Sequence, residues 1–162
     1  MADVSKAGPS IIDRRLGPRG PSELREFLSF RLGADAYAVE LARIKEIVSS
    51  PPLTEVPRAP SDVVGVCSVR GLLVTVIDLR RRLRLVESPT TRLSRILLAT
   101  TDSGEIVGLL VDEVRHVVRL SSSEIEVTSN LLGGELADHV LGVGRPTGDF
   151  LVLLDLGSVV ER

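Results

Sequence analysis

The chain has very few residues of the types that carry out chemistry in enzymes. Among its 162 residues are one cysteine, two histidines, three phenylalanines and one tyrosine, with no tryptophan. A single cysteine excludes an internal disulfide and a zinc site built from thiolates, and each histidine stands alone in the sequence. The sequence therefore predicts neither a metal site nor covalent cross-links within the chain.

The chain also lacks a large excess of charge of one sign, and it lacks long apolar segments. Twenty basic and twenty-two acidic residues give a formal net charge of −2, and so weak a charge provides no field for a polyphosphate. We therefore expect no nucleic-acid partner. No apolar segment approaches the roughly 18 residues of a membrane-spanning helix, and residues 1–21 lack the order of a secretory signal. The sequence predicts a cytoplasmic protein without direct membrane insertion.

Aliphatic residues are abundant instead. Val, Leu and Ile supply 55 residues, which is enough to bury a sizeable core. Residues 1–23, rich in glycine and proline, are expected to form a flexible N-terminal tail. From Phe27 onward, short β-branched and aliphatic segments alternate with turn residues about every ten positions, as in small barrels and sandwiches. The predicted fold class is all-β.

Three pairs of these segments are predicted to form β-hairpins, because a short turn containing glycine separates the two members of each pair. The pairs are residues 27–32 with 37–41, residues 63–69 with 72–79, and residues 95–100 with 106–111. Leu41, Ile44 and Ile47 recur every three residues, which favours one or two helical turns. Three serines followed by Glu124 form a helix-capping pattern.

The second half of the chain repeats the first. Leu41, Ile44 and Ile47 recur seventy positions later as Val111, Val114 and Val117. Five further matches occur at an offset of seventy-seven: Gly65, Val66, Gly71, Asp78 and Leu79 with Gly142, Val143, Gly148, Asp155 and Leu156. The change of offset places seven extra residues between positions 120 and 140. We interpret the halves as two copies of one unit of four or five strands, folded as two small barrels that pack together.

No convergent set of catalytic residues accompanies this repeat. Asp112 and Glu113 are adjacent, and adjacent side chains of a strand point to opposite faces, so we interpret them as a solvated strand end. Cys67 lies in an apolar strand without a nearby base, and His116 lacks a second metal ligand. The arginines within residues 80–84 alternate with leucines, which indicates a solvated rim rather than a nucleic-acid patch. The sequence predicts a non-enzymatic protein without a cofactor.

The remaining feature is a surface suited to binding. Two packed barrels create a groove, and an apolar groove suits an amphipathic helix or helical hairpin better than a polar metabolite. Arg70, at the turn before Gly71, has two interpretations at this stage. Its guanidinium either pairs with an acidic residue of a partner or braces the hairpin against a carboxylate such as Asp78 or Glu46.

Several segments together resemble the CheW-like domain, the scaffold protein of bacterial chemotaxis. The main segments are residues 56–60 (VPRAP) and 65–80 (GVCSVRGLLVTVIDLR). Supporting segments are residues 27–33 with Tyr37, Glu46 with Ile47, residues 108–114, and Gly142 with residues 153–156. The resemblance extends from Phe27 to about Val160. The family usually has Asn in place of Ser68 and often Pro in place of Thr75.

The resemblance implies two packed five-stranded SH3-like β-barrels. Residues 24–160 would form one CheW-like domain, with a first subdomain at about 24–88 and a second at about 92–145. A C-terminal strand and short helix at about 148–160 are candidates to complete the first subdomain.

The resemblance also implies a non-enzymatic adaptor that couples chemoreceptors to a CheA-type histidine kinase in a chemotaxis or chemosensory array. The receptor's cytoplasmic helical hairpin would lie in the groove between the barrels, and one barrel would dock on the kinase's CheW-like regulatory domain. The positions that match the family's receptor- and kinase-binding residues are Ile44, Glu46, Gly65, Arg70, Gly71, Leu73, Val114 and Val117. Two alternatives are a paralogue that binds receptor without engaging the kinase, and a small-ligand-binding β-barrel.

Overall fold

The computed structural model describes residues 23–127 and 134–160, so the expected tail at residues 1–23 lies outside the described residues except for Glu23. The first half contains β1 (Leu24–Leu32), β2 (Asp35–Glu40), the 3-10 helix η3 (Leu41–Arg43), β3 (Ile44–Ser49), β4 (Val63–Val69), β5 (Leu72–Asp78) and α2 (Leu79–Arg82). The second half contains β6 (Arg95–Thr100), β7 (Ile106–Val111), β8 (Glu113–Ser121), η4 (Ser122–Glu124), η5 (Gly134–His139), β9 (Val140–Gly144), β10 (Leu151–Leu154) and α3 (Leu156–Val160).

The predicted all-β class and the three predicted hairpins are confirmed. β1 pairs with β2, β4 with β5, and β6 with β7, all in antiparallel orientation. Their turns contain Gly33, Gly71 and Gly104, with φ angles of 66°, 82° and 90°, a backbone conformation that glycine adopts without strain. No helix among the described residues is long and apolar enough to cross a membrane.

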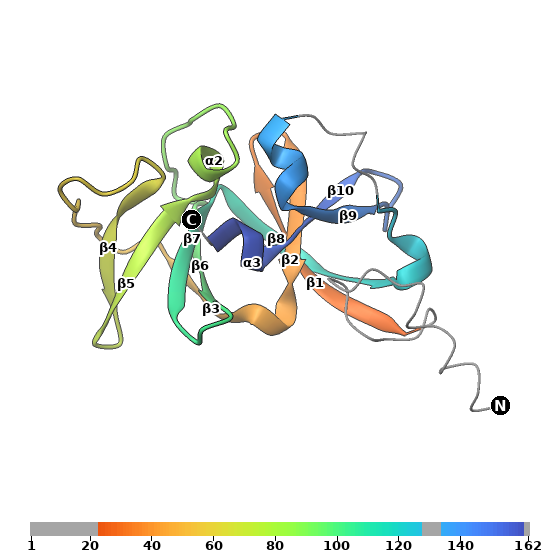
Figure 1. Ribbon diagram of the computed structural model, residues 1–162, viewed down its shortest axis with the longest axis horizontal. Helices are drawn as coiled ribbons and strands as arrows, with labels where there is room; N and C mark the ends of the chain where they lie inside the picture. Colours follow the sequence, from red (N-terminus) through yellow and green to blue (C-terminus); the bar gives the residue numbers. More distant parts are fainter. Residues whose placement is uncertain (1–22, 128–133, 161–162) are drawn as a thin grey trace.

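Each half of the chain contributes strands to both of two five-stranded sheets (Figure 1). Sheet A has the order β8-β1-β2-β10-β9, and sheet B has the order β3-β6-β7-β5-β4. Replacing every strand by its counterpart in the other half, β1 by β6, β2 by β7 and so on, converts one order into the other. The duplication inferred from the sequence is therefore visible in the topology, with strands exchanged between the halves.

This exchange corrects the expected subdomain boundaries. Residues 24–88 and 92–145 do not form separate sheets, because β3 pairs with β6 and β5 pairs with β7, whereas β1 pairs with β8 and β2 with β10. The C-terminal segment does join the first hairpin, since β10 runs parallel to β2 with Val152 opposite Tyr37. The matched positions of the two halves identify equivalent strands, but they do not say which strands lie side by side, because distant strands are brought together by packing in the shared core.

The three-residue spacing of apolar residues marks β-bulges, and the prediction of one or two helical turns is wrong beyond η3. Ile44 begins strand β3. In β8, Val114 and Val117 lie opposite Phe30 and Leu28, so three steps along β8 correspond to two along β1. A similar shift of register occurs in β3. One extra residue changes the two-residue period of a strand into a spacing of three.

Apolar side chains between the sheets form a central cluster, while each sheet also covers a smaller cluster of its own. The central cluster combines Phe30 and Tyr37 of sheet A with Leu97 and Leu109 of sheet B, and Leu156 of α3. Figure 1 shows α3 between the two sheets. Fully burying one such side chain contributes about 1.5–3 kcal/mol. The inner strands have both faces covered, which explains their nearly continuous apolar sequences.

The matched glycines Gly65 and Gly142 lie where another segment of backbone crosses closely. Thr54 forms an isolated bridge with Val66, next to Gly65, and Glu126 forms one with Val143, next to Gly142. A Cβ atom on Gly65 would lie 2.6 Å from the Thr54 carbonyl oxygen, and one on Gly142 would lie 2.8 Å from that of Glu126. The repeat therefore conserves a glycine between its two copies because each sheet has the same close approach.

We expect Gly142→Ala to lower the free energy of unfolding by about 1–3 kcal/mol. The new methyl group would displace the Glu126 backbone, which exchanges hydrogen bonds of 2.9 and 2.8 Å with Val143. Urea unfolding followed by circular dichroism measures the change. The control is Gly144→Ala in the same strand, where the closest atom is a side-chain end, Cδ1 of Leu120 at 2.8 Å, rather than backbone. A larger loss in the control would contradict this account of Gly142.

Candidate binding surface

The edge strand β3 presents two apolar side chains beside the central cluster. Ile44 lies opposite Ala99 and Ile47 lies opposite Leu97, and both partners are fully buried in that cluster. Side chains directly opposite one another on paired strands share a face of the sheet. Ile44 packs against the central cluster, whereas Ile47 is 42% exposed at its margin.

The edge strand β8 repeats this arrangement in sheet A. Val114 packs against the central cluster, and Val117 is 43% exposed. Each edge strand thus carries one half-buried and one exposed apolar side chain at equivalent positions of the repeat. We call Ile44, Ile47, Val114 and Val117 the apolar edge residues. The sequence analysis selected all of them except Ile47, although the match of Ile47 with Val117 was the signal that could have found it.

Arg70 and Glu46 form a bidentate ion pair between the β4–β5 turn and β3. The Arg70 Nε and Nη2 atoms donate to the Glu46 carboxylate oxygens at 3.1 and 2.5 Å. Hydrogen bonds from Arg70 hold the pKa of Glu46 below its ordinary value, and they raise the pKa of Arg70 in turn. Because β3 and β4 are the two edges of sheet B, the pair connects both edges.

This pair bears on the two interpretations of Arg70 that the sequence left open. The guanidinium does brace the hairpin against Glu46, yet 73% of the Arg70 side chain is exposed. Arg70 lies at the tip of the turn, where its backbone has a positive φ of 51°. The charged group is therefore held in place and remains accessible from solvent.

The other predicted positions lie in different environments. Gly71 is exposed in the same turn as Arg70. Leu73 is 75% exposed on β5, opposite Ser68, and it lines a hollow with residues 104–107. Gly65 is buried against Thr54, so its role here is to permit the close backbone crossing. The structure thus brings Glu46 to Arg70, and it brings Ile44 and Val114 to one cluster.

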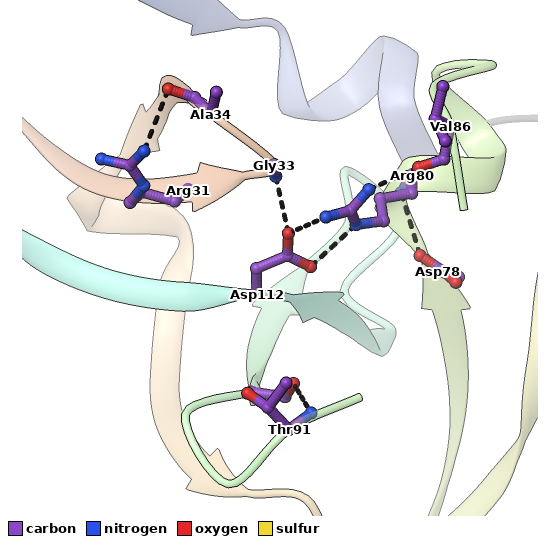
Figure 2. Close-up of polar contacts among 9 residues, drawn as sticks. Arg31, Gly33, Ala34, Asp78, Arg80, Val86, Thr91 and Asp112 are labelled. Atoms are coloured by element: carbon purple, nitrogen blue, oxygen red, sulfur yellow. Dashed lines mark hydrogen bonds and ion pairs between the residues drawn. The ribbon is translucent and has the colours of Figure 1, made fainter. Parts of the chain in front are cut away.

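A polar cluster lies where the two sheets meet, and Figure 2 shows its hydrogen bonds. Arg80 Nε donates to Asp112 at 2.9 Å, and its Nη2 donates to the other carboxylate oxygen. The Gly33 backbone N–H donates to Asp112 at 2.6 Å. Burial raises the pKa of Asp112, but the hydrogen bonds from Arg80 and Gly33 outweigh this effect and hold the pKa below its ordinary value.

The sequence interpretation of these two charged residues is wrong. Arg80 was expected on a solvated rim, but it is only 9% exposed, and Asp112 accepts three hydrogen bonds. Leu79 and Leu83 do face inward, as expected. Asp78 caps α2 by accepting a hydrogen bond from the backbone N–H of Arg80 at 2.9 Å, and this fixes the start of the helix. The Arg80 side chain can be buried there because Asp112 pairs with its charge.

The structure also shows the surroundings of the side chains that could react or bind a metal. Cys67 is buried, and burial raises the pKa of its thiol, which disfavours the nucleophilic thiolate. His116 is exposed on β8. Among residues 23–127 and 134–160, no group of three or more side chains is placed to hold a metal ion.

Comparison with known proteins decides the family, because the family model for the CheW-like domain matches residues 26–162. The chain belongs to the CheW-like family. Its relatives named CheW are non-enzymatic scaffolds, and this protein is a non-enzymatic scaffold protein of chemotaxis.

Individual relatives agree with this assignment. The CheW-like chain is 30% identical over 136 residues to the chemotaxis protein CheW of Rhizobium meliloti (strain 1021), covering 83% of this chain and 86% of the relative. It is 27% identical over 141 residues to that of Thermotoga maritima, covering 86% and 91%. The scaffolding protein TtCheW from Thermoanaerobacter tengcongensis has a TM-score of 0.79 at 23% identity, covering 86% and 94% of the two chains, and shows the same fold.

We expect Arg70→Ala in this CheW-like protein to raise the pKa of Glu46 into its ordinary range, because the hydrogen bonds that favour the carboxylate are lost. An NMR titration of the Glu46 carboxyl measures this shift. In the wild type the pair stabilises the fold above the ordinary pKa of Glu46, and this contribution disappears as pH falls through the lowered pKa.

The same substitution should change Tm by less than about 3 °C, because exposed ion pairs contribute little to stability. Arg115→Ala, on the exposed side of β8, is the control for loss of a surface arginine. A much larger fall in Tm for Arg70→Ala would show that the pair is primarily a structural brace.

Proposed function

We propose that this CheW-like protein is an adaptor that couples chemoreceptors to a CheA-type histidine kinase in a cytoplasmic chemotaxis or chemosensory array. The observation that carries the proposal is that the edge strands expose apolar side chains, while β3 also holds the accessible Glu46–Arg70 pair on its other face. Ile47 and Val117 are exposed at equivalent positions of the two halves, beside a core that both sheets share. A contiguous exposed apolar patch marks an interaction surface, and we take Ile47 and Val117 as parts of one such patch.

The cytoplasmic helical hairpin of a receptor has the chemistry to cover this surface. An amphipathic helix places apolar side chains at intervals of three and four residues, and these would contact Ile47 and Val117. The guanidinium of Arg70 would contact a polar residue at the rim of the interface, where charge chiefly sets register and partner choice. No cofactor takes part in such an interaction.

A second surface is our candidate for the kinase regulatory domain. Leu72 and Leu73 are 58% and 75% exposed at the start of β5. They line the hollow that also includes Gly104 and Glu105 of the β6–β7 turn. This surface belongs to sheet B alone, so a kinase domain could dock there without contacting sheet A.

We expect Val117→Asp to weaken binding of a purified receptor hairpin fragment at least about tenfold, because a carboxylate would be desolvated in an apolar interface. Isothermal titration calorimetry measures the affinity. Val127→Asp is the matched control, since Val127 is 54% exposed and belongs to neither β3 nor β8. Equal affinities of the two variants would place the receptor elsewhere.

The same preparation tests the kinase interaction. We expect the wild type and Val117→Asp to bind the kinase regulatory domain with similar affinity, because the candidate surface for the kinase lies on sheet B. Absence of binding by the wild type at tens of micromolar would favour the receptor-only paralogue.

A further inference from the structure

The chain passes between the two sheets most abruptly at Asp112. Strand β7 of sheet B ends at Val111 and strand β8 of sheet A begins at Glu113. At the equivalent crossing in the first half, η3 separates β2 from β3 with three residues, Leu41–Arg43. One residue, Asp112, therefore connects the two sheets where three residues connect them in the other half. The conformation of Asp112 directly affects the orientation of one sheet relative to the other.

Both sheets hold Asp112 through hydrogen bonds. Its backbone N–H donates to the Arg31 carbonyl at 3.1 Å, and its carboxylate accepts from the Gly33 N–H at 2.6 Å. Arg31 and Gly33 lie at the β1–β2 turn of sheet A. Arg80 approaches from α2, directly after β5 of sheet B, and its Nη1 also donates to the Val86 carbonyl. Figure 2 shows the carboxylate between these two groups of donors.

The equivalent crossing in the first half is held in a different way. Arg43 donates to the Thr100 carbonyl from Nε at 3.0 Å and from Nη2 at 2.9 Å, and Nη2 also reaches Asp102 at 3.0 Å. The Asp102 side chain is 74% exposed, against 32% for Asp112 and 11% for Arg80. Glu40, directly before η3, does form a shielded pair with Arg25, with side chains 29% and 5% exposed, but this pair joins β2 to β1 within sheet A. The Arg80–Asp112 pair instead joins elements of both sheets, and a pair removed from water is screened less than an exposed one.

We propose that Asp112, held by Arg80 and Gly33, is a positioning residue that sets the orientation of the two sheets and thereby the spacing between β3 and β8. Val114 and Val117 follow Asp112 closely on β8, so a displacement of Asp112 moves both of them relative to Ile44 and Ile47. The consequence for receptor binding rests on the proposed function, in which one helical hairpin contacts both edge strands.

Two substitutions weaken this arrangement with little change in volume. Asp112→Asn keeps the shape of the side chain but replaces one acceptor oxygen by an NH₂ donor, which cannot accept from Arg80 or Gly33. Arg80→Lys keeps the charge and the aliphatic stem, but an ammonium lacks the planar fork that holds both carboxylate oxygens. Asp102→Asn at the equivalent crossing is the matched control, because Arg43 retains its bonds to the Thr100 carbonyl.

The orientation is measured by pulsed electron paramagnetic resonance between nitroxide labels. His116 on β8 of sheet A and Thr75 on β5 of sheet B are both exposed, and labels are attached at His116→Cys and Thr75→Cys in a Cys67→Ala background. We expect Asp112→Asn and Arg80→Lys to shift or broaden the distance distribution relative to the labelled protein without a further substitution. Asp102→Asn should leave that distribution unchanged. Circular dichroism should show the same strand content in all of them.

Receptor affinity is then measured on the unlabelled variants with the purified hairpin fragment. We expect Asp112→Asn and Arg80→Lys to bind at least about tenfold more weakly than Asp102→Asn. Binding of the kinase regulatory domain should be unchanged, because its candidate surface lies within one sheet. A merely structural role would lower both affinities together.

Several outcomes would overturn the proposal. These are an unchanged distance distribution in both variants and loss of cooperative folding in both variants. A changed distribution with unchanged receptor affinity would overturn the stated consequence for receptor binding. The distance measurement requires no receptor. A wild type that does not bind the hairpin would therefore refute the proposed function, while the distances alone would still decide whether Asp112 orients the sheets.

Discussion

The central apolar cluster between the two sheets is the interaction on which the rest of the structure depends. It buries side chains from the inner strands of both sheets, including Phe30 and Leu109, together with Leu156 of α3. Because the halves exchange strands, neither half of the chain forms a sheet by itself. The chain crosses between the sheets from β2 to β3 and from β7 to β8, and each crossing leads into an edge strand beside the cluster. Packing and the candidate binding surface therefore have a common origin.

Two ion pairs on this framework differ in what their surroundings allow them to do. The Glu46–Arg70 pair is largely exposed, so solvent screens it, and its chief consequence is the fixed position of an accessible guanidinium. The Arg80–Asp112 pair is more shielded and joins elements of both sheets. Removing one partner there would leave a charge in a poorly solvated site. The same chemistry thus yields an accessible, fixed guanidinium in one pair and a shielded link between the sheets in the other.

For a scaffold, the composition and the function agree. The many aliphatic residues fill three adjoining clusters, and a few of them, such as Ile47 and Val117, remain exposed where the clusters reach the edge strands. Such a protein needs surfaces held in a definite relation to one another rather than reactive side chains. The scarcity of cysteine, histidine and aromatic residues is consistent with that requirement.

The sequence by itself determined the all-β class, the three hairpins and the duplication, and it left Asp78, Glu46 or a partner's acidic residue as candidates to pair with Arg70. These features depend on turn glycines and on alternation over a few residues, which act locally. Only the tertiary structure decided which sheet each strand joins, that the three-residue spacings are bulges, and that Arg80 is buried against Asp112. The local pattern of a strand does not say which distant strand lies beside it, so this choice is made by packing in a core that the whole chain builds.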